Sequence, residues 1–343
     1  MSRNPKRKSK DMNEQNPKKM RHRPTLKLEN APPANSIHDL IEIGKSIRFY
    51  KNLDTVMLWK ITPYLEMLDK MIGMKTLKES IFYQIIYYLK GMHTRNKNEE
   101  YLHTMILGPP GHGKTEVARI IGRIYQAMGI LSSSGPFRVA YRDDFIAEYL
   151  GQTAIKTRKL LKSCLGGVLF VDEVYSLGPG QKDRDSFAKE CMETITVFLS
   201  EHKNDFCFIG AGYEEDVNKC FFAGNKGLER RFQWIHKIQE YKVDELTDIL
   251  LKMVADMKWE IGMDKEDIKK ILKEEKELFK NAGGDIETFL SKCKMVHAKR
   301  VFSLDPEHMF IFTKKDMENS IELIKKNKLK NDIDDGKYLS MYM

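Results

Sequence analysis

The chain has 343 residues, 41% of them hydrophobic, which is enough for one large domain with a smaller companion and a sizeable buried core. Its formal charge of +9 is concentrated at one end, because residues 1–30 hold ten Lys or Arg and three Asp or Glu, whereas the remainder holds 48 basic and 46 acidic residues. A nearly neutral body argues against a basic nucleic-acid groove, and five cysteines without a CxxC pair together with scattered histidines argue against a zinc site.

Hydrophobic runs in the chain are short. None approaches the ~18 apolar residues of a membrane-spanning helix, and no apolar segment follows the first basic residues as it would in a signal peptide. We therefore expect a soluble intracellular protein, in the cytoplasm or nucleus, without a membrane partner.

The N-terminal 35 residues are rich in Lys, Arg, Asn and Pro and hold few apolar side chains, which predicts a disordered basic tail. Within it, Pro5–Lys10 and Pro17–Arg23 match nuclear-import or nucleic-acid-binding patches, and a plain solvated tail is the alternative. Apolar residues at helical spacing then predict a helical extension over residues 36–63.

Short apolar runs alternate with helical patterns from residue 64 to 240. Strands are predicted near Leu102–Leu107, Phe137–Tyr141, Val168–Val171, Phe206–Gly210 and Gln233–Ile238, with helices over Lys114–Leu131, Thr153–Leu161 and Asp185–Glu201 between them. This alternation predicts an α/β domain in which a five-stranded parallel sheet is flanked by helices.

Beyond Tyr241 only helical periodicity is found, and no strand is predicted. We expect a separate small helical domain over residues 241–330, followed by a C-terminal tail at 331–343. Its predicted helices are Val243–Met257, Lys265–Ala282, Ile286–Phe302 and Lys314–Lys328, and Gly283-Gly284 before Asp285 predicts a helix end and a new N-cap.

A phosphate-binding loop lies between the first predicted strand and helix. It consists of Gly108, Pro109, Pro110, Gly111, His112, Gly113, Lys114 and Thr115, an instance of G-x-x-x-x-G-K-[ST], and Glu116 follows it. Glycines let backbone N–H groups surround phosphates at a helix N-terminus. Lys114 is expected on the β- and γ-phosphates of ATP and Thr115 on Mg²⁺. A simple Gly/Pro turn with an exposed lysine is the structural alternative.

Two carboxylates end the apolar run Val168–Val171, 58 residues after Lys114. Ligands of open α/β sheets bind at the carboxyl ends of the strands, where an acidic pair is costly unless a cation and water engage it. Asp172 is therefore the expected outer ligand of Mg²⁺, and Glu173 the expected base for the attacking water. An N-capping aspartate would be the structural alternative if the phosphate loop were absent.

These elements together resemble the AAA+ superfamily, and in particular the CbbX/CfxQ (red-type Rubisco activase) family, with relatives in bacteria, plastids and large DNA viruses. The resemblance spans residues 64–330. It rests also on Ile72-Gly73, similar to the adenine-pocket element, on Tyr141–Thr153, on Ile209–Val217 and on Asn225–Trp234. It implies a P-loop AAA+ module with a C-terminal helical lid domain, and the cytoplasm or nucleus of a host cell if the source is viral.

The resemblance also implies roles for further residues. Tyr149, Leu150 and Gly151 match the family's pore loop, which grips a polypeptide, although Tyr149 alone would equally suit a core position at a helix start. Arg231, followed by Arg230, matches the arginine finger that reaches a neighbouring subunit in a ring, a hexamer in this family; an ordinary exposed charge is the alternative. Tyr213 occupies the sensor-1 place. The sensor-2 stretch, Gly283–Leu290, lacks a basic residue, and Arg300 is a distant substitute.

We therefore expect an ATPase that works as a homo-oligomeric ring and remodels or threads a protein substrate. One alternative is a nucleic-acid motor or loader that holds the phosphate backbone with its basic tail. Another is a nucleotide-regulated scaffold that hydrolyses ATP poorly. Nothing in these residues identifies the substrate.

Overall fold

The computed structural model describes residues 28–46, 48–94, 100–149, 151–179, 185–223, 225 and 227–341, with side chains left out at 94, 306 and 328–341. The basic tail before residue 28, with both of its Lys/Arg-rich patches, lies outside the described residues, and so does Leu150 of the predicted pore loop. No helix in the described part of the chain is long and apolar enough to cross a membrane.

A five-stranded parallel sheet forms the centre of the large domain, as predicted. Its strands are β1 (Thr104–Leu107), β2 (Phe137–Ala140), β3 (Val168–Val171), β4 (Cys207–Gly212) and β5 (Trp234–Lys237). Their order is β2-β3-β4-β1-β5, and every neighbouring pair is parallel. The strand before the phosphate loop and the strand before the carboxylate pair are therefore separated only by β4, and all three end at the same edge of the sheet.

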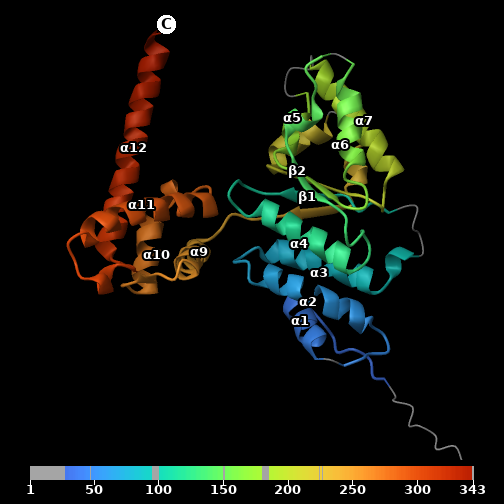
Figure 1. The fold of residues 1–343 in the computed structure, drawn as a ribbon, viewed down its shortest axis with the longest axis horizontal. Coiled ribbons are helices and arrows are strands. Elements are labelled where there is room, and N and C mark those ends of the chain that lie inside the picture. The colour runs from blue at the N-terminus through green and yellow to red at the C-terminus, as the bar shows by residue number, and fades with distance from the viewer. Residues whose placement is uncertain are drawn as a thin grey trace, which may run out of the picture.

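Helices cover both faces of this sheet (Figure 1). They are α3 (Lys75–Leu89), α4 (Lys114–Ala127), α5 (Arg142–Phe145), α6 (Thr153–Lys162) and α7 (Ser186–Glu201); the short α8 (Glu214–Asp216) follows β4 and buries no residue. Because side chains alternate along a strand, Ile106 and Phe170 pack into the core shared with α3 and α4, whereas Met105 and Leu169 pack into the core shared with α6 and α7. Both faces are buried, which explains the continuous apolar runs in the sequence.

The N-terminal helices belong to the large domain. The helix α1 (Ile37–Lys45) is capped by Ser36, and α2 (Thr55–Asp69) is capped by Asp54, whose carboxylate accepts from the Met57 N–H at 2.9 Å. Both helices contribute to the same hydrophobic core as α3, α4 and one face of the sheet. The boundary predicted at residues 63 and 64 falls inside α2, so the extension has no core of its own.

A helical lid domain with its own core follows β5 and stands beside the large domain (Figure 1). It contains α9 (Val243–Asp256), α10 (Lys265–Glu274), α11 (Gly283–Val301) and α12 (Lys314–Met341). The prediction that no strand follows Tyr241 was wrong, because β6 (Glu260–Ile261) pairs in parallel with β7 (Ile311–Phe312). Two-residue strands are too short to show an alternating pattern in the sequence.

Two helix boundaries in the lid also differ from the prediction. The helix expected over Lys265–Ala282 ends at Glu274, and the residues before α11 form a short 3-10 helix followed by a turn. Asp285 is not the N-cap: α11 already begins at Gly283, and the Asp285 carboxylate instead accepts from the Asn281 N–H at 2.6 Å. The glycine pair therefore starts the helix.

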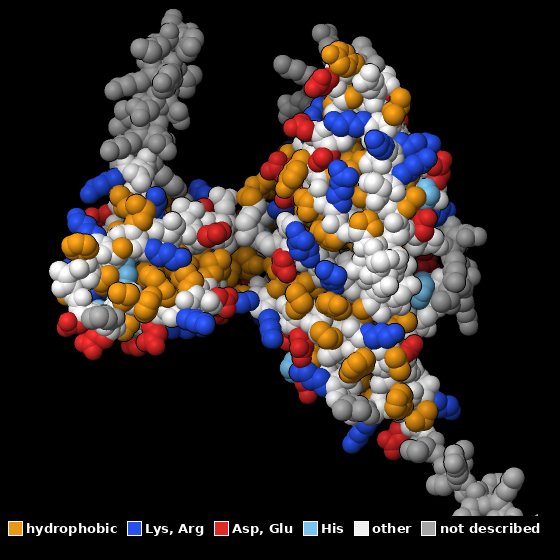
Figure 2. All heavy atoms as spheres, viewed as in Figure 1, with side chains coloured by type: hydrophobic (Ala, Val, Ile, Leu, Met, Phe, Trp, Pro, Cys, Tyr) orange, Lys and Arg blue, Asp and Glu red, His pale blue; other side chains and the backbone are white. Residues whose placement is uncertain are grey.

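Charged side chains of both signs are spread over the surface of both domains (Figure 2).

Candidate nucleotide-binding site

The phosphate loop adopts a glycine-dependent conformation between β1 and α4. Gly111 and Gly113 have φ of 69° and 74°, which side-chain-bearing residues rarely adopt. Their conformation turns the chain so that α4 begins at Lys114, and the first N–H groups of that helix have no partner within the helix. The loop therefore presents backbone donors at the positive end of a helix, as an anion site requires.

Lys114 is held inside this loop. Its ammonium donates to the carbonyl oxygens of Gly108 and Pro109, at 3.1 and 2.8 Å. Burial lowers the pKa of Lys114, and the negative charges of Asp172 and Glu173 oppose that shift. A lysine satisfied only by carbonyl oxygens at the base of a cavity is available to exchange those contacts for phosphate oxygens.

A cavity of about 380 Å³ joins the phosphate loop to the carboxylate pair. It is lined by Pro110, Gly111, Gly113, Lys114, Thr115, Asp172, Glu173, Tyr175, Gly212, Tyr213, Met253, Gly283, Gly284 and Glu287. The sequence-predicted lysine, threonine and both carboxylates thus share one cavity. Thr115 and Asp172 offer hydroxyl and carboxylate oxygens, the ligand types that Mg²⁺ prefers, so the residues present fit a magnesium–nucleotide complex.

Glu173 lies in a tight turn after β3. Its φ of 50° and ψ of 45° are left-handed, and its backbone N–H donates to the Asp172 carboxylate at 3.0 Å. A non-glycine residue in this conformation is strained, and such strain concentrates at functional sites. The turn leaves the Glu173 side chain exposed at the cavity, where it can meet a water molecule.

Two tyrosines border the same carboxylate. Burial, followed by the negative charge of Glu173, raises the pKa of Tyr175 to about 12, and the same two causes in the same order raise the pKa of Tyr213. Both phenols therefore stay protonated at neutral pH and are able to donate hydrogen bonds. The Lys114 ammonium lies 5.8 Å from the centre of the Tyr213 ring, so the predicted sensor-1 residue faces the phosphate loop.

His112 fixes the outer side of the loop. It is buried, stacks on Tyr241 with ring centres 4.8 Å apart, and its Nδ1 lies 2.7 Å from the Pro110 carbonyl oxygen. Gly73 lies against Tyr241, where a Cβ would approach that ring at 2.9 Å. The segment that holds the predicted Ile72-Gly73 element therefore meets the loop through Tyr241 and also directly, because the Cε atoms of Met71 and Met74 lie 3.2 and 3.3 Å from the position of a Cβ at Gly113. The role of Tyr241 depends on packing alone, so no motif in the sequence indicates it.

The lid domain contacts the phosphate loop through its backbone. The Gly283 N–H donates to the Gly111 carbonyl oxygen at 3.2 Å, and a Cβ at Gly111 would collide with the Asn281 carbonyl oxygen. The start of α11 also brings Glu287 to the lining of the cavity, and no motif in the sequence indicates this. The lid thus contributes glycines and an acidic side chain at this point.

Arg300 is engaged elsewhere in the lid. It donates from Nε to both carboxylate oxygens of buried Asp316, at 2.9 and 3.1 Å, and from Nη2 to the Ile311 carbonyl oxygen at 3.1 Å. His297 completes this network at 3.2 Å from the same carboxylate. The suggestion that Arg300 substitutes for a sensor-2 arginine was wrong, because its guanidinium ties α11 to α12.

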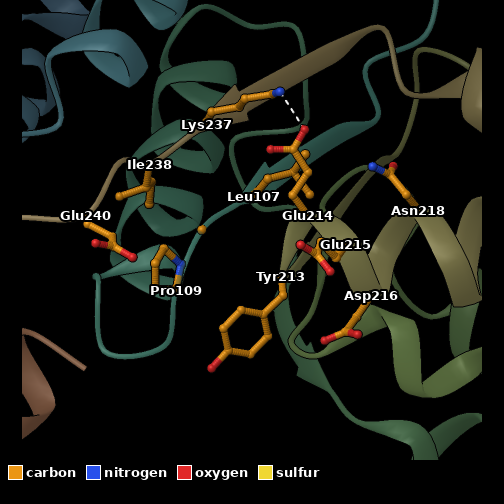
Figure 3. Close-up of a pocket in the computed structure, with 11 residues that line it drawn as sticks. Leu107, Pro109, Tyr213, Glu214, Glu215, Asp216, Asn218, Lys237, Ile238 and Glu240 are labelled. Atoms are coloured by element: carbon orange, nitrogen blue, oxygen red, sulfur yellow. Dashed lines mark hydrogen bonds and ion pairs between the residues drawn. The ribbon is translucent and has the colours of Figure 1, made fainter. Parts of the chain in front are cut away.

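A larger cavity of about 740 Å³ adjoins the first at Tyr213, which lines both (Figure 3). Four carboxylates line it, from Glu214, Glu215, Asp216 and Glu240, and its lysine, Lys237, is paired with Glu214 at 2.6 Å. Because Lys237 is already paired with a carboxylate, it is not available to an anionic ligand, whereas Lys114 in the smaller cavity contacts only carbonyl oxygens. Phosphates therefore belong to the smaller cavity that contains Lys114.

Glu116, predicted with the phosphate loop, is exposed in the first turn of α4 and lines neither cavity.

The two candidate finger arginines differ. Arg231 donates from Nε to the Thr196 carbonyl oxygen at 3.1 Å and to Ser200 Oγ at 2.7 Å, and its Nη1 donates to the Gly227 carbonyl oxygen. These hydrogen bonds hold the turn that contains Arg231 against α7. Arg230 is exposed and makes no hydrogen bond or ion pair within the part of the chain that the structure describes.

The described part of the predicted pore loop is at the surface. Tyr149 is 66% exposed, which excludes the core position that was its alternative. Gly151 has a φ of 80°, and no atom lies within 4 Å of the position of a Cβ there. An exposed aromatic side chain beside an unhindered glycine can reach a partner outside the subunit.

Comparison with known proteins agrees with this geometry. Residues 104–221 match the family model described as ATPase family associated with various cellular activities (AAA). The chain is 37% identical over 272 residues to the putative cfxQ-like protein R730 of Acanthamoeba polyphaga mimivirus, covering 78% of this chain and 66% of that protein. It is 33% identical over 221 residues to the CfxQ homolog of Trieres chinensis, covering 64% of this chain and 74% of that protein.

A third relative is the chloroplastic ribulose bisphosphate carboxylase/oxygenase activase of Cyanidioschyzon merolae, 37% identical over 210 residues that cover 60% of this chain and 67% of that protein. Among solved structures, a mutant of Thermotoga maritima RuvB superposes with a TM-score of 0.54 at 18% identity, over 75% of this chain and 72% of that one. The ADP complex of the FIGL-1 AAA domain gives 0.52 at 16% identity, over 74% and 82%. At such identities the superpositions show the fold alone.

Proposed function

Because the chain belongs to the AAA+ ATPases, within the CfxQ/CbbX family, we propose that it hydrolyses ATP as a ring of identical subunits and uses that cycle to remodel or thread a polypeptide. The observation that carries the proposal is the shared cavity of Lys114, Thr115, Asp172 and Glu173. These residues follow two strands, β1 and β3, that end at the same edge of the sheet on either side of β4.

Each residue of that cavity has a chemical task in the proposal. The loop N–H groups and Lys114 hold the phosphates, and Glu173 accepts a proton from the attacking water. Thr115 and Asp172 would hold Mg²⁺, which neutralises charge on the phosphate oxygens when it is bound. Tyr175 and Tyr213 line the same cavity and are protonated at neutral pH, so their phenols would donate hydrogen bonds toward Glu173 and the phosphates.

A second subunit would complete the site through Arg230. Its guanidinium is exposed and without a partner among the described residues, whereas Arg231 is committed to α7. We therefore assign the finger to Arg230 and a structural role to Arg231, which reverses the order favoured by the resemblance. A free cation at the subunit surface can stabilise transition-state charge in the next subunit.

Tyr149 would contact the polypeptide. Large aromatic side chains supply apolar contact area at low cost in side-chain entropy, and this one is at the surface beside a glycine. The likeness to a Rubisco activase concerns that relative, and for this chain we propose only the class of substrate, an unfolded or locally unfolded polypeptide. A nucleic-acid motor and a weakly active scaffold are the competing outcomes of the test.

The test uses ATP turnover and mass by light scattering, with Mg²⁺ present. Glu173→Gln should retain ATP and accumulate a ring without turnover, whereas Lys114→Ala should lose nucleotide binding altogether. Glu266→Gln, an exposed carboxylate on α10 that lines none of these cavities, is the matched control. A monomer without turnover in the unmodified protein would favour the scaffold, and normal turnover in Glu173→Gln would place the base elsewhere.

The remodelling step is tested on the trapped ring. A reduced and carboxymethylated protein serves as the unfolded polypeptide, and Glu173→Gln with ATP should capture it. Adding Tyr149→Ala should remove the capture without dispersing the ring. If the ring instead binds single-stranded DNA and ignores the polypeptide, the nucleic-acid reading replaces this one.

A further inference from the structure

Two exposed apolar sites lie on different domains of the chain. The first, here called the plug, is the connection 302–310 between α11 and β7, with Phe302, Leu304, Met309 and Phe310 exposed on the lid. Phe302 is 92% exposed, so it makes almost no contact with its own subunit. Four exposed large apolar side chains within one short connection are unusual on a soluble surface and mark a candidate interaction site.

The second site, here called the socket, lies where α1 is joined to α2. Phe49, Val56 and Trp59 are exposed around an apolar cavity of about 370 Å³, which Gly44, Arg48 and Thr55 complete. Trp59 is 62% exposed although its neighbours Leu58 and Ile61 on the same helix are fully buried. Figure 2 shows hydrophobic side chains at the surface both of the lid domain and of the part of the large domain that carries α1 and α2.

We propose that the plug of one subunit docks into the socket of the next, so that successive copies are joined head to tail. The inference rests on the proposed function, and it adds to the proposed ring a contact between subunits that lies outside the nucleotide site. Phe302 makes almost no contact within its own subunit, and the socket offers an apolar hollow of about 370 Å³ in which such a side chain could be buried. Two different surfaces that fit each other produce a heterologous contact, which closes into a ring when the rotation between copies allows it.

The charges around the two sites favour this pairing. Residues 48–60, which hold the socket, contain Arg48, Lys51 and Lys60 against Asp54, three positive charges less one negative, or +2. Residues 302–310 contain Asp305 and Glu307 and no Lys or Arg, or −2. Arg48 and Lys60 are exposed and form no ion pair among the described residues. Opposite charges around an apolar contact steer association, whereas two plugs or two sockets facing each other would repel.

Contact between two different copies can be tested by cross-linking a mixture. Every variant carries Cys220→Ser, because Cys220 is the cysteine that is not buried among the free cysteines of the described chain. Phe302→Cys and Trp59→Cys proteins are purified separately, mixed with ATP and Mg²⁺, and treated with a short bismaleimide. Both positions are exposed, so neither substitution should impair folding.

The proposal expects a cross-linked dimer in the mixture and none with either variant alone. Replacing Trp59→Cys by Ile155→Cys, which is exposed on α6 across the sheet, should also give none. Phe302→Ser should raise the protein concentration of half-assembly by roughly 30-fold, as loss of a buried aromatic anchor does.

Absence of the mixed dimer would overturn the plug and socket, and so would a dimer of Phe302→Cys alone, which would mean that two lids associate symmetrically. Light scattering and ATP turnover of the unmodified protein are measured in parallel. If rings form and hydrolyse ATP while no mixed dimer forms, only the interface is wrong. If neither rings nor turnover are found, the proposed function fails as well.

Discussion

Replacing Gly111 by alanine should loosen the lid from the phosphate loop. At a φ of 69° an alanine costs about 1–2 kcal/mol of stability from backbone strain alone. Its Cβ would in addition collide with the Asn281 carbonyl oxygen, so the start of α11 has to move and the Gly283 to Gly111 hydrogen bond is lost. That bond is worth about 1 kcal/mol, which corresponds to a roughly fivefold change in the local opening equilibrium.

Gly129 provides the matched control for this substitution. Its φ is 73°, nearly the same as that of Gly111, and nothing lies within 4 Å of the position of its Cβ. Gly129→Ala therefore carries the backbone strain without the collision. Gly283→Ala, which has an ordinary helical φ but whose Cβ would lie 2.8 Å from the Gly111 carbonyl oxygen, carries the collision without the strain.

Hydrogen exchange of the amides at the start of α11 measures the effect. Exchange at Gly283 should be roughly fivefold faster in Gly111→Ala and in Gly283→Ala than in the unmodified protein, and unchanged in Gly129→Ala. The midpoint temperature of thermal unfolding should fall in both Gly111→Ala and Gly129→Ala, because each places an alanine at a positive φ. Equal exchange at Gly283 in the Gly111 and Gly129 variants would refute the conclusion that the lid rests on the phosphate loop through these glycines.

Three further predictions concern single side chains. Arg230→Ala should reduce ATP turnover by about 10³-fold or more with little change in melting temperature. Arg231→Ala should instead lower the melting temperature, because it removes the contacts with α7. The opposite pattern would assign the arginine finger to Arg231. Glu287→Gln should tighten ATP binding by about fivefold in a fluorescence titration, because it removes a repelling carboxylate from the phosphate cavity; unchanged affinity would mean that this carboxylate points away from the phosphates. Burial lowers the pKa of His236 to about 4, below its unfolded value of about 6.5, so the stability that depends on the neutral ring is complete above pH 6.5 and is lost as the pH falls toward 4. In denaturant unfolding, His236→Gln should reduce the slope of unfolding free energy against pH in that range by up to roughly 1.4 kcal/mol per pH unit. An unaltered slope would contradict the assignment.

The sheet and the phosphate cavity could be predicted because they depend on local patterns. Lys114 is placed by its own loop, and Asp172 by the end of a buried strand, so the motif and the strand order suffice to bring them together. The same holds for Val168–Val171, whose predicted and observed bounds coincide. Such features need no knowledge of which distant side chains meet.

Contacts between distant segments could not be predicted in the same way. Arg231 looks like a free cation in the sequence, and its bonds to Thr196 and Ser200 exist only because α7 packs beside its turn. Tyr241 on His112, and Glu287 in the phosphate cavity, likewise depend on where the lid sits. The boundary placed inside α2 failed for a related reason, since helical periodicity shows which side of a helix is buried but not which core it joins.

The left-handed backbone at Glu173 has a consequence for engineering. A glycine there would relieve roughly 1 kcal/mol of strain while removing the carboxylate on which water activation depends. Directed evolution that selects only for thermal stability or expression should therefore enrich Glu173→Gly, and the resulting proteins would be more stable but would not hydrolyse ATP. A library built from this chain needs a screen for turnover alongside any screen for thermostability.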